Sequence, residues 1–148
     1  LLFFGFNSSG QDSTITKSKL LKLFKSSIRQ NHKPKISTTS NPWVICNEDS
    51  SYYISDTLSL YPYSNNYPYC RCQCYIDWTF YKKDAFILTQ EFTDEPRRVN
   101  ATSSWFTLKV LNRKLDLILE IYNQEGFVEH FKVLSVTKSI ILLRIKST

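Results

Sequence analysis

Apolar and polar residues alternate with a period of two over most of the chain after Trp43. The alternation is clearest at Ile76/Trp78/Phe80 and at Leu115/Leu117/Leu119/Ile121. A period of two is typical of half-buried β-strands, since successive side chains point to opposite faces. The pattern predicts strands at Trp43–Cys46, Tyr52–Ile54, Thr57–Tyr61, Cys72–Tyr81, Ala85–Phe92, Trp105–Leu111, Leu115–Tyr122, Phe127–Val136 and Ile140–Ile145.

The connections between several of these strands are short. Lys82-Lys83-Asp84, Asn112-Arg113, Asn123-Gln124-Glu125-Gly126 and Thr137-Lys138 each leave room only for a tight turn. Strands joined in this way are antiparallel neighbours. The sequence therefore predicts a mainly β fold, an antiparallel up-and-down β-barrel or strongly curved meander, with one helix before it.

That helix is predicted between a cap at Thr16 or Ser18 and a stop near Asn31 and Pro34. Its apolar residues, Leu20, Leu21, Leu23, Phe24 and Ile28, share one face, and its basic residues occupy the other. An amphipathic helix of this kind binds a membrane surface, binds a partner, or docks on its own domain. We favour docking, because a solvated charged face is the common situation.

The positive charge is concentrated in one segment. The net charge is +6, and seven basic residues lie between Lys17 and Lys35, with no acid between Asp12 and Glu48. The rest of the chain carries twelve basic and thirteen acidic side chains. Phosphate binding by the β region is disfavoured by this balance, and no nucleic-acid partner is predicted.

The first residues resemble the end of a secretory signal peptide. Leu1–Phe6 is apolar, and Ser8 and Gly10 precede Gln11 at the spacing that signal peptidase recognises. The alternative is an apolar strand in the core. We favour the signal, which predicts an exported, periplasmic or secreted protein. The predicted organisation is a signal remnant at 1–10, a helix and polar linker at 11–41, and a β-barrel domain at 42–148, monomeric and without a transmembrane segment.

The four cysteines are Cys46, Cys70, Cys72 and Cys74. In an extended strand the last three point to one face, together with Trp78. We expect Cys46 to form a disulfide with one of them, because disulfides persist outside the cytosol and cysteines two apart on a strand do not bridge easily. Free buried thiols, a redox-active C-x-C pair and a thiolate metal site are the alternatives, and no metal is predicted.

Catalytic motifs are lacking. His32 and His130 are the two histidines, and the sequence contains no nucleophile elbow, metal-binding histidine pair or glycine-rich phosphate loop. We therefore predict a protein that is not an enzyme and needs no cofactor.

The segments WTFYKKDAF, SSWFTLKV, KLDLILEIY and FKVLSVTKSIILLRI, after the helix and Trp43, resemble the small lipocalin-like domains of exported bacterial proteins. The resemblance implies a barrel that holds a small apolar ligand. The inward aromatic and aliphatic residues expected to contact it are Trp78, Phe80, Phe86, Phe106 and Leu117. The alternative is a barrel with a solid core that contacts an envelope protein partner through its surface.

Overall fold

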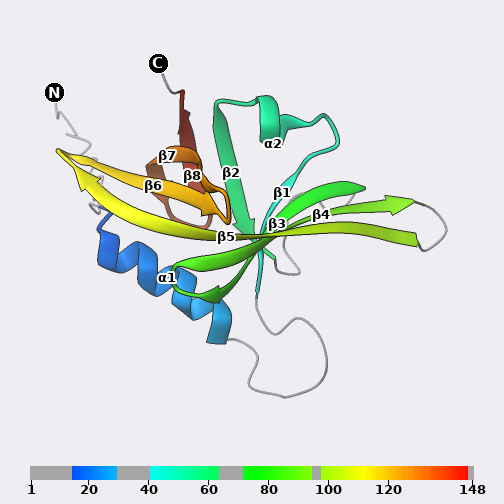
Figure 1. Cartoon of the computed structure of the whole chain (residues 1–148), viewed down its shortest axis with the longest axis horizontal. Helices are drawn as coiled ribbons and strands as arrows, with labels where there is room; N and C mark the ends of the chain where they lie inside the picture. The colour runs from blue at the N-terminus through cyan, green and yellow to red at the C-terminus, as the bar shows by residue number, and fades with distance from the viewer. Residues whose placement is uncertain (1–14, 30–40, 64–71, 95–97, 147–148) are drawn as a thin grey trace, which may run out of the picture.

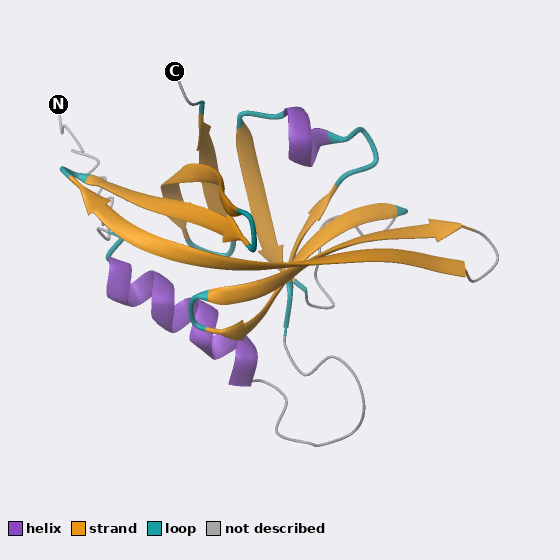
Figure 2. Cartoon of the chain, viewed as in Figure 1, coloured by secondary structure: helices purple, strands orange, loops and turns teal. Residues whose placement is uncertain are grey.

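The computed structural model describes residues 15–29, 41–63, 72–94 and 98–146, which form a closed eight-stranded antiparallel barrel with two helices (Figures 1 and 2). The fold class predicted from the alternation is confirmed. The elements are α1 (Lys17–Arg29), β1 (Trp43–Cys46), α2 (Ser51–Ile54), β2 (Thr57–Pro62), β3 (Cys74–Lys82), β4 (Ala85–Asp94), β5 (Arg98–Arg113), β6 (Asp116–Asn123), β7 (Gly126–Val136) and β8 (Ile140–Ile145).

The strand order departs from a simple meander at one place. Around the barrel the order is β1-β2-β8-β7-β6-β5-β4-β3, so β3 to β8 follow one another and β1 lies between β2 and β3. Trp43 accordingly pairs with Pro62 on one side and with Trp78 on the other. Strands β2 and β3 follow each other in the chain but are not neighbours in the barrel, which the lengths of the tight turns could not predict.

The hairpin of β4 and β5 extends well beyond the barrel (Figure 1). Its pairing runs without a shift from Ala85 opposite Thr107 to Asp94 opposite Arg98. We predicted that the strand would begin at Trp105, which is too late, since β5 begins at Arg98. Residues 101–104 are exposed, so they have no buried face to impose an apolar period.

The segment predicted as a strand at Tyr52–Ile54 is instead the short helix α2. Two side chains before it bond its free amides: Asn47 Oδ1 accepts from the Tyr52 N–H at 2.9 Å, and Asp49 Oδ1 accepts from the Ser51 N–H at 2.9 Å. Asparagine and aspartate favour such local bonds over a sheet ladder. The prediction was wrong because the turn chemistry before Tyr52 outweighs its β propensity.

The core lies inside the barrel and is built from alternate residues of all the strands. Each strand points one set of side chains inward, as the period of two predicted. The buried interior set comprises Trp43, Ile45, Leu58, Leu60, Ile76, Trp78, Phe80, Phe86, Leu108, Val110, Leu117, Leu119, Ile121, Phe131, Val133, Ile140 and Leu142.

Helix α1 lies across the end of the barrel where β3 finishes (Figure 2). Thr16 is its cap, since its hydroxyl oxygen accepts from the Lys19 N–H at 3.2 Å. Leu20 and Phe24 are fully buried, and the Phe24 ring stacks on Phe80 with centroids 4.2 Å apart. The expected docking of the apolar face onto the β domain is therefore confirmed.

The opposite end of the barrel is covered by α2 (Figure 1). Tyr52 is 2% exposed, and its hydroxyl accepts from Trp78 Nε1 at 3.1 Å. Arg144 of β8 donates to the carbonyl oxygens of Tyr52, Tyr53 and Ser55, and its Nε donates to Glu129 at 3.1 Å. This end is thus closed by a polar network.

Several sequence predictions concern residues outside the described ranges. They are the signal remnant at 1–10, the end of the helix near Asn31, the linker before Asn41, and Cys70.

Across the described residues, neither helix has the length and apolar character needed to cross a bilayer.

Candidate functional site

The residues predicted to contact a ligand lie together inside the barrel. Trp78 stacks on Phe86 with centroids 4.5 Å apart, and Phe86 in turn stacks on Phe106 at 5.6 Å. Phe80 contacts Phe86 at 5.3 Å, and Leu117 is 5% exposed in the same core. The structure therefore brings all five predicted residues into one hydrophobic cluster. In this cluster they pack against one another and against other core residues.

This cluster continues to both ends of the barrel. At the α1 end, Phe24 stacks on Phe80. Toward the α2 end, Trp78 meets Phe131 at 6.4 Å and donates to the Tyr52 hydroxyl. Rings in mutual contact leave little room for a guest, because protein interiors are packed to crystal-like density.

One polar atom in the interior lacks a partner. Trp43 is 4% exposed, and its Nε1 finds no acceptor among the described residues. An orphaned buried donor costs about 1–3 kcal/mol unless water or a ligand supplies an acceptor. Trp43 therefore marks the point in the barrel where a bound water or polar ligand atom would be stabilised.

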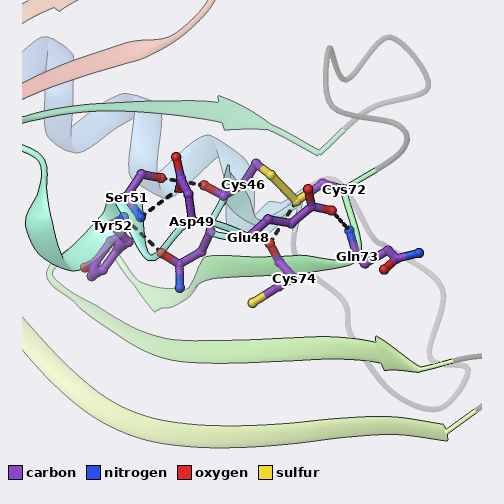
Figure 3. Close-up of a disulfide and its surroundings, with 9 residues drawn as sticks. Cys46, Glu48, Asp49, Ser51, Tyr52, Cys72, Gln73 and Cys74 are labelled. Carbon is purple, nitrogen blue, oxygen red and sulfur yellow. Dashed lines mark hydrogen bonds between the residues drawn. A yellow bond between two sulfur atoms is a disulfide. The ribbon is translucent and has the colours of Figure 1, made fainter.

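At the α2 end a disulfide joins Cys46 to Cys72, with Cα atoms 5.9 Å apart (Figure 3). This confirms the expected pairing of Cys46 with a member of the cysteine cluster. The predicted shared face was wrong for Cys72, because β3 begins only at Cys74 and Cys72 turns to the neighbouring strand. Cys74 is free and buried, and Figure 3 shows its sulfur pointing away from the disulfide.

Glu48 lies beside this disulfide, and the cysteine pattern did not predict it. Its Oε1 accepts from the Gln73 N–H at 2.6 Å, and its carboxylate and the two sulfurs lie within 4.8 Å of one another. Sulfurs joined in a disulfide are poor metal ligands, because a metal requires the thiolate. The disulfide therefore links the end of β1 covalently to the residues just before β3.

Two open clefts flank the loop that carries Glu48. One of about 390 Å³ is lined by Ile45, Cys46, Glu48, Asp49, Ser51, Ser55, Thr57 and Ser59. The other, of about 480 Å³, is lined by Asn47, Glu48, Ser50, Gln73, Cys74, Gln90 and Phe92. Most of the residues that line them are polar, and in the first cleft Asp49 Oδ1 accepts from the Ser51 N–H at 2.9 Å.

On the outer face of the barrel, β3 and β4 bring two carboxyl groups near each other. Asp77 is 6% exposed and accepts from the Thr79 hydroxyl at 2.8 Å, while Glu91 accepts from the Tyr75 hydroxyl at 2.6 Å. Burial, with a smaller effect from the charge of Glu91, raises the pKa of Asp77 to about 6. The sequence places both acids in strands, but the pairing of β3 with β4 is needed to bring them together.

Beside α1 lies a third cleft, of about 460 Å³, which we call the basic cleft; its lining residues are Lys17, Ser18, Leu21, Lys22, Lys25 and Lys83. Five of them come from one side of the helix and Lys83 comes from the β3–β4 turn. No ion pair joins these lysines to an acidic residue in the described part of the chain. The basic cleft is a site of unneutralised positive charge on an apolar floor.

Sequence reasoning missed the polar closure at the α2 end. Arg144 and Glu129 alternate in phase with the inward residues of their strands, at Leu142 and Phe131 respectively. Charged residues in phase with a buried face are a signal that could have predicted an internal ion pair. Burial raises the pKa of Glu129, and the nearby Arg144 guanidinium partly offsets that rise.

Comparison of the chain with protein-family models, with curated proteins and with solved structures found no match. The lipocalin-like resemblance therefore stays a prediction.

Proposed function

We propose that this barrel is a non-catalytic binding module that acts through its outer surface. The observation that carries this proposal is the continuous packing of the interior from Phe24 of α1 to Tyr52 of α2. A carrier needs an enclosed space of a few hundred Å³. In this barrel the aromatic rings pack against one another instead. The interior then provides rigidity, and the surface provides recognition.

The second candidate is the carrier of a small apolar ligand, and one observation favours it. Trp43 Nε1 is a buried donor without an acceptor among the described residues, which a ligand oxygen would satisfy. A ligand that reached Trp43 from the α1 end would first have to displace Phe24. One buried water would accept the hydrogen bond of Trp43 Nε1 equally well, so we rank the carrier second.

Titration of the purified protein with fatty acids and with an environment-sensitive dye separates the two candidates. A Trp105→Phe background leaves Trp43 and Trp78, both buried in the barrel, as the reporters of fluorescence. We expect no saturable change in emission. Saturable binding that Trp78→Ala or Phe106→Ala weakens without unfolding the domain contradicts the proposal and establishes the carrier.

The matched positive control is Phe24→Ala. Removing this ring opens an apolar cavity at the α1 end, and such cavities bind small apolar molecules. A dye signal in Phe24→Ala and none in the parent shows that the assay detects interior binding. The absence of binding in the parent is then meaningful.

A further inference from the structure

We propose that the basic cleft and the neighbouring aromatic pair Tyr81 and Trp105 form a docking surface for a lipid bilayer that carries anionic headgroups. This inference rests on the proposed function, because it names the partner of a module that acts through its surface. Its elements are the lysines that line the basic cleft, its apolar floor, and two exposed aromatic rings.

The charge of this surface comes from two elements that the fold brings together. Lys17, Lys22 and Lys25 lie on one side of α1, and Lys83 approaches them from the β3–β4 turn. Lys82 of the same hairpin is exposed as well. Asp84 is exposed beside Lys83, but it does not line the basic cleft. Anionic lipids attract such clusters by about 1 kcal/mol per lysine near the membrane.

The apolar part of the surface favours a bilayer over a small anion. Leu21 and the lysine methylenes form the floor of the basic cleft, since they are the apolar groups among its lining residues. Trp105 is 55% exposed and Tyr81 is 39% exposed, with their ring centroids 5.1 Å apart. Tryptophan and tyrosine beside lysine are typical of proteins that lie at the membrane–water boundary.

The position of the aromatic pair relative to the lysines follows from strand register. Tyr81 immediately precedes the β3–β4 turn, and Trp105 pairs with Ile87 just after that turn. The pair therefore adjoins the hairpin that carries Lys83. Because the rings meet edge to face, with planes at 71°, they do not form a parallel stack of platforms for nucleic-acid bases.

Outside residues 13–47 the chain carries almost balanced charge, with twelve basic and thirteen acidic side chains. A nucleic-acid strand requires a basic track that continues along the protein. A flat anionic surface requires only a local patch. The charge distribution therefore favours the bilayer.

Co-sedimentation with vesicles of equal parts phosphatidylcholine and phosphatidylglycerol, compared with vesicles of phosphatidylcholine alone, tests the proposal. We expect binding to the anionic vesicles, a blue shift of Trp105 emission and loss of binding in high salt. Lys22→Ala with Lys83→Ala should weaken binding about fivefold per lysine. Trp105→Ala should weaken binding and abolish the shift.

The matched control is Lys146→Ala. Lys146 follows β8 and forms an exposed ion pair with Asp56, which comes just after α2 at the opposite end of the barrel. This variant should bind anionic vesicles as the parent does. Equal weakening by Lys146→Ala and by Lys83→Ala would show unspecific attraction and overturn the proposal.

Two other outcomes overturn the assignment of the partner. Absence of binding to anionic vesicles contradicts it, whether or not the interior of the barrel takes up a fatty acid. Binding to single-stranded RNA or heparin with the same dependence on Lys22 and Lys83, and none to vesicles, assigns a soluble polyanion instead. The interior titration judges the proposed function separately, so the two failures are distinguishable.

Discussion

The two ends of the barrel are closed by opposite kinds of chemistry. At one end α1 buries Leu20 and Phe24, and the closure depends on apolar packing. At the other end, Arg144 binds three carbonyl groups of the α2 region and the carboxylate of Glu129. Apolar side chains can repack after a substitution, whereas a buried hydrogen-bonded network is satisfied only when its donors and acceptors keep one arrangement. The α2 end is therefore the more narrowly specified of the two.

The outer surfaces of the two ends differ as well. The α1 end exposes unpaired lysines in the basic cleft. The α2 end exposes polar clefts beside Glu48 and Asp49 and is fastened by the Cys46–Cys72 disulfide. The surface of the α1 end is thus complementary to an anionic partner, whereas the disulfide at the α2 end stabilises the fold.

Removal of the Phe24 ring, which closes the α1 end of the barrel, has the largest expected effect on stability. Phe24→Ala deletes a fully buried ring that stacks on Phe80 and should lower the free energy of unfolding by about 4 kcal/mol. Chemical denaturation measures this loss, and amide exchange should accelerate in α1 but not in α2. Lys25→Ala, an exposed position on the same helix, serves as the control. Unchanged stability of Phe24→Ala would show that α1 does not close the barrel.

Disruption of the polar end follows in size. Arg144→Ala leaves Glu129 without its cation and frees the carbonyl groups around α2, at a cost of about 3 to 4 kcal/mol. Faster amide exchange should appear in α2 rather than in α1. Adding Glu129→Gln to this variant should restore part of the stability, because the carboxylate left without its partner is then neutral. Lack of any restoration would argue against an ion pair at this end.

Between the two ends, Asp77 predicts a dependence on pH. Its pKa is raised by burial from 3.8 to about 6, so the folded protein retains a proton that the unfolded chain has lost. Stability contributed by neutral Asp77 is therefore complete below about pH 4 and is lost as the pH rises through about 6.

Asp77→Asn should abolish that loss. At about pH 7 the variant should be more stable than the parent by about 2 to 3 kcal/mol, and the gain should shrink toward pH 4. Denaturation curves across this pH range measure the difference, and Asp84→Asn, at an exposed turn position, is the control. A variant less stable than the parent at neutral pH would mean that ionised Asp77 has a favourable partner.

The smallest expected effect is at the junction of core and α2. Tyr52→Phe removes the acceptor of Trp78 Nε1 and should cost about 1 kcal/mol. The indole emission of Trp78 should shift while the barrel stays folded. A loss of unfolding free energy equal to that of Arg144→Ala would show that the Tyr52 hydroxyl, and not the hydrogen bonds of Arg144, stabilises this end.

The apolar end was predictable from the sequence, because its signal is local. Leu20 and Phe24 recur at helical spacing, and the strand faces recur at a spacing of two, so docking and barrel class both follow. The pairing of Cys46 with the cysteine cluster followed from geometry, although the choice of Cys72 required the true start of β3.

The polar end was not predictable in the same way. The helix α2 depends on bonds from Asn47 and Asp49, and propensity alone assigned Tyr52–Ile54 to a strand. Arg144 meets α2 only because the barrel closes with β2 against β8. The basic cleft likewise depends on a long-range contact, between α1 and the β3–β4 turn. Such contacts are decided by closure, which no local pattern encodes.

The central claim is that both ends of the barrel are closed over a filled interior. Native mass spectrometry of the protein isolated without organic solvent, compared with the denatured mass of the same sample, tests this claim directly. We predict equal masses apart from bound water. A stoichiometric additional mass in the native spectrum, removed by organic extraction and absent from Trp78→Ala, would show that the barrel encloses a ligand.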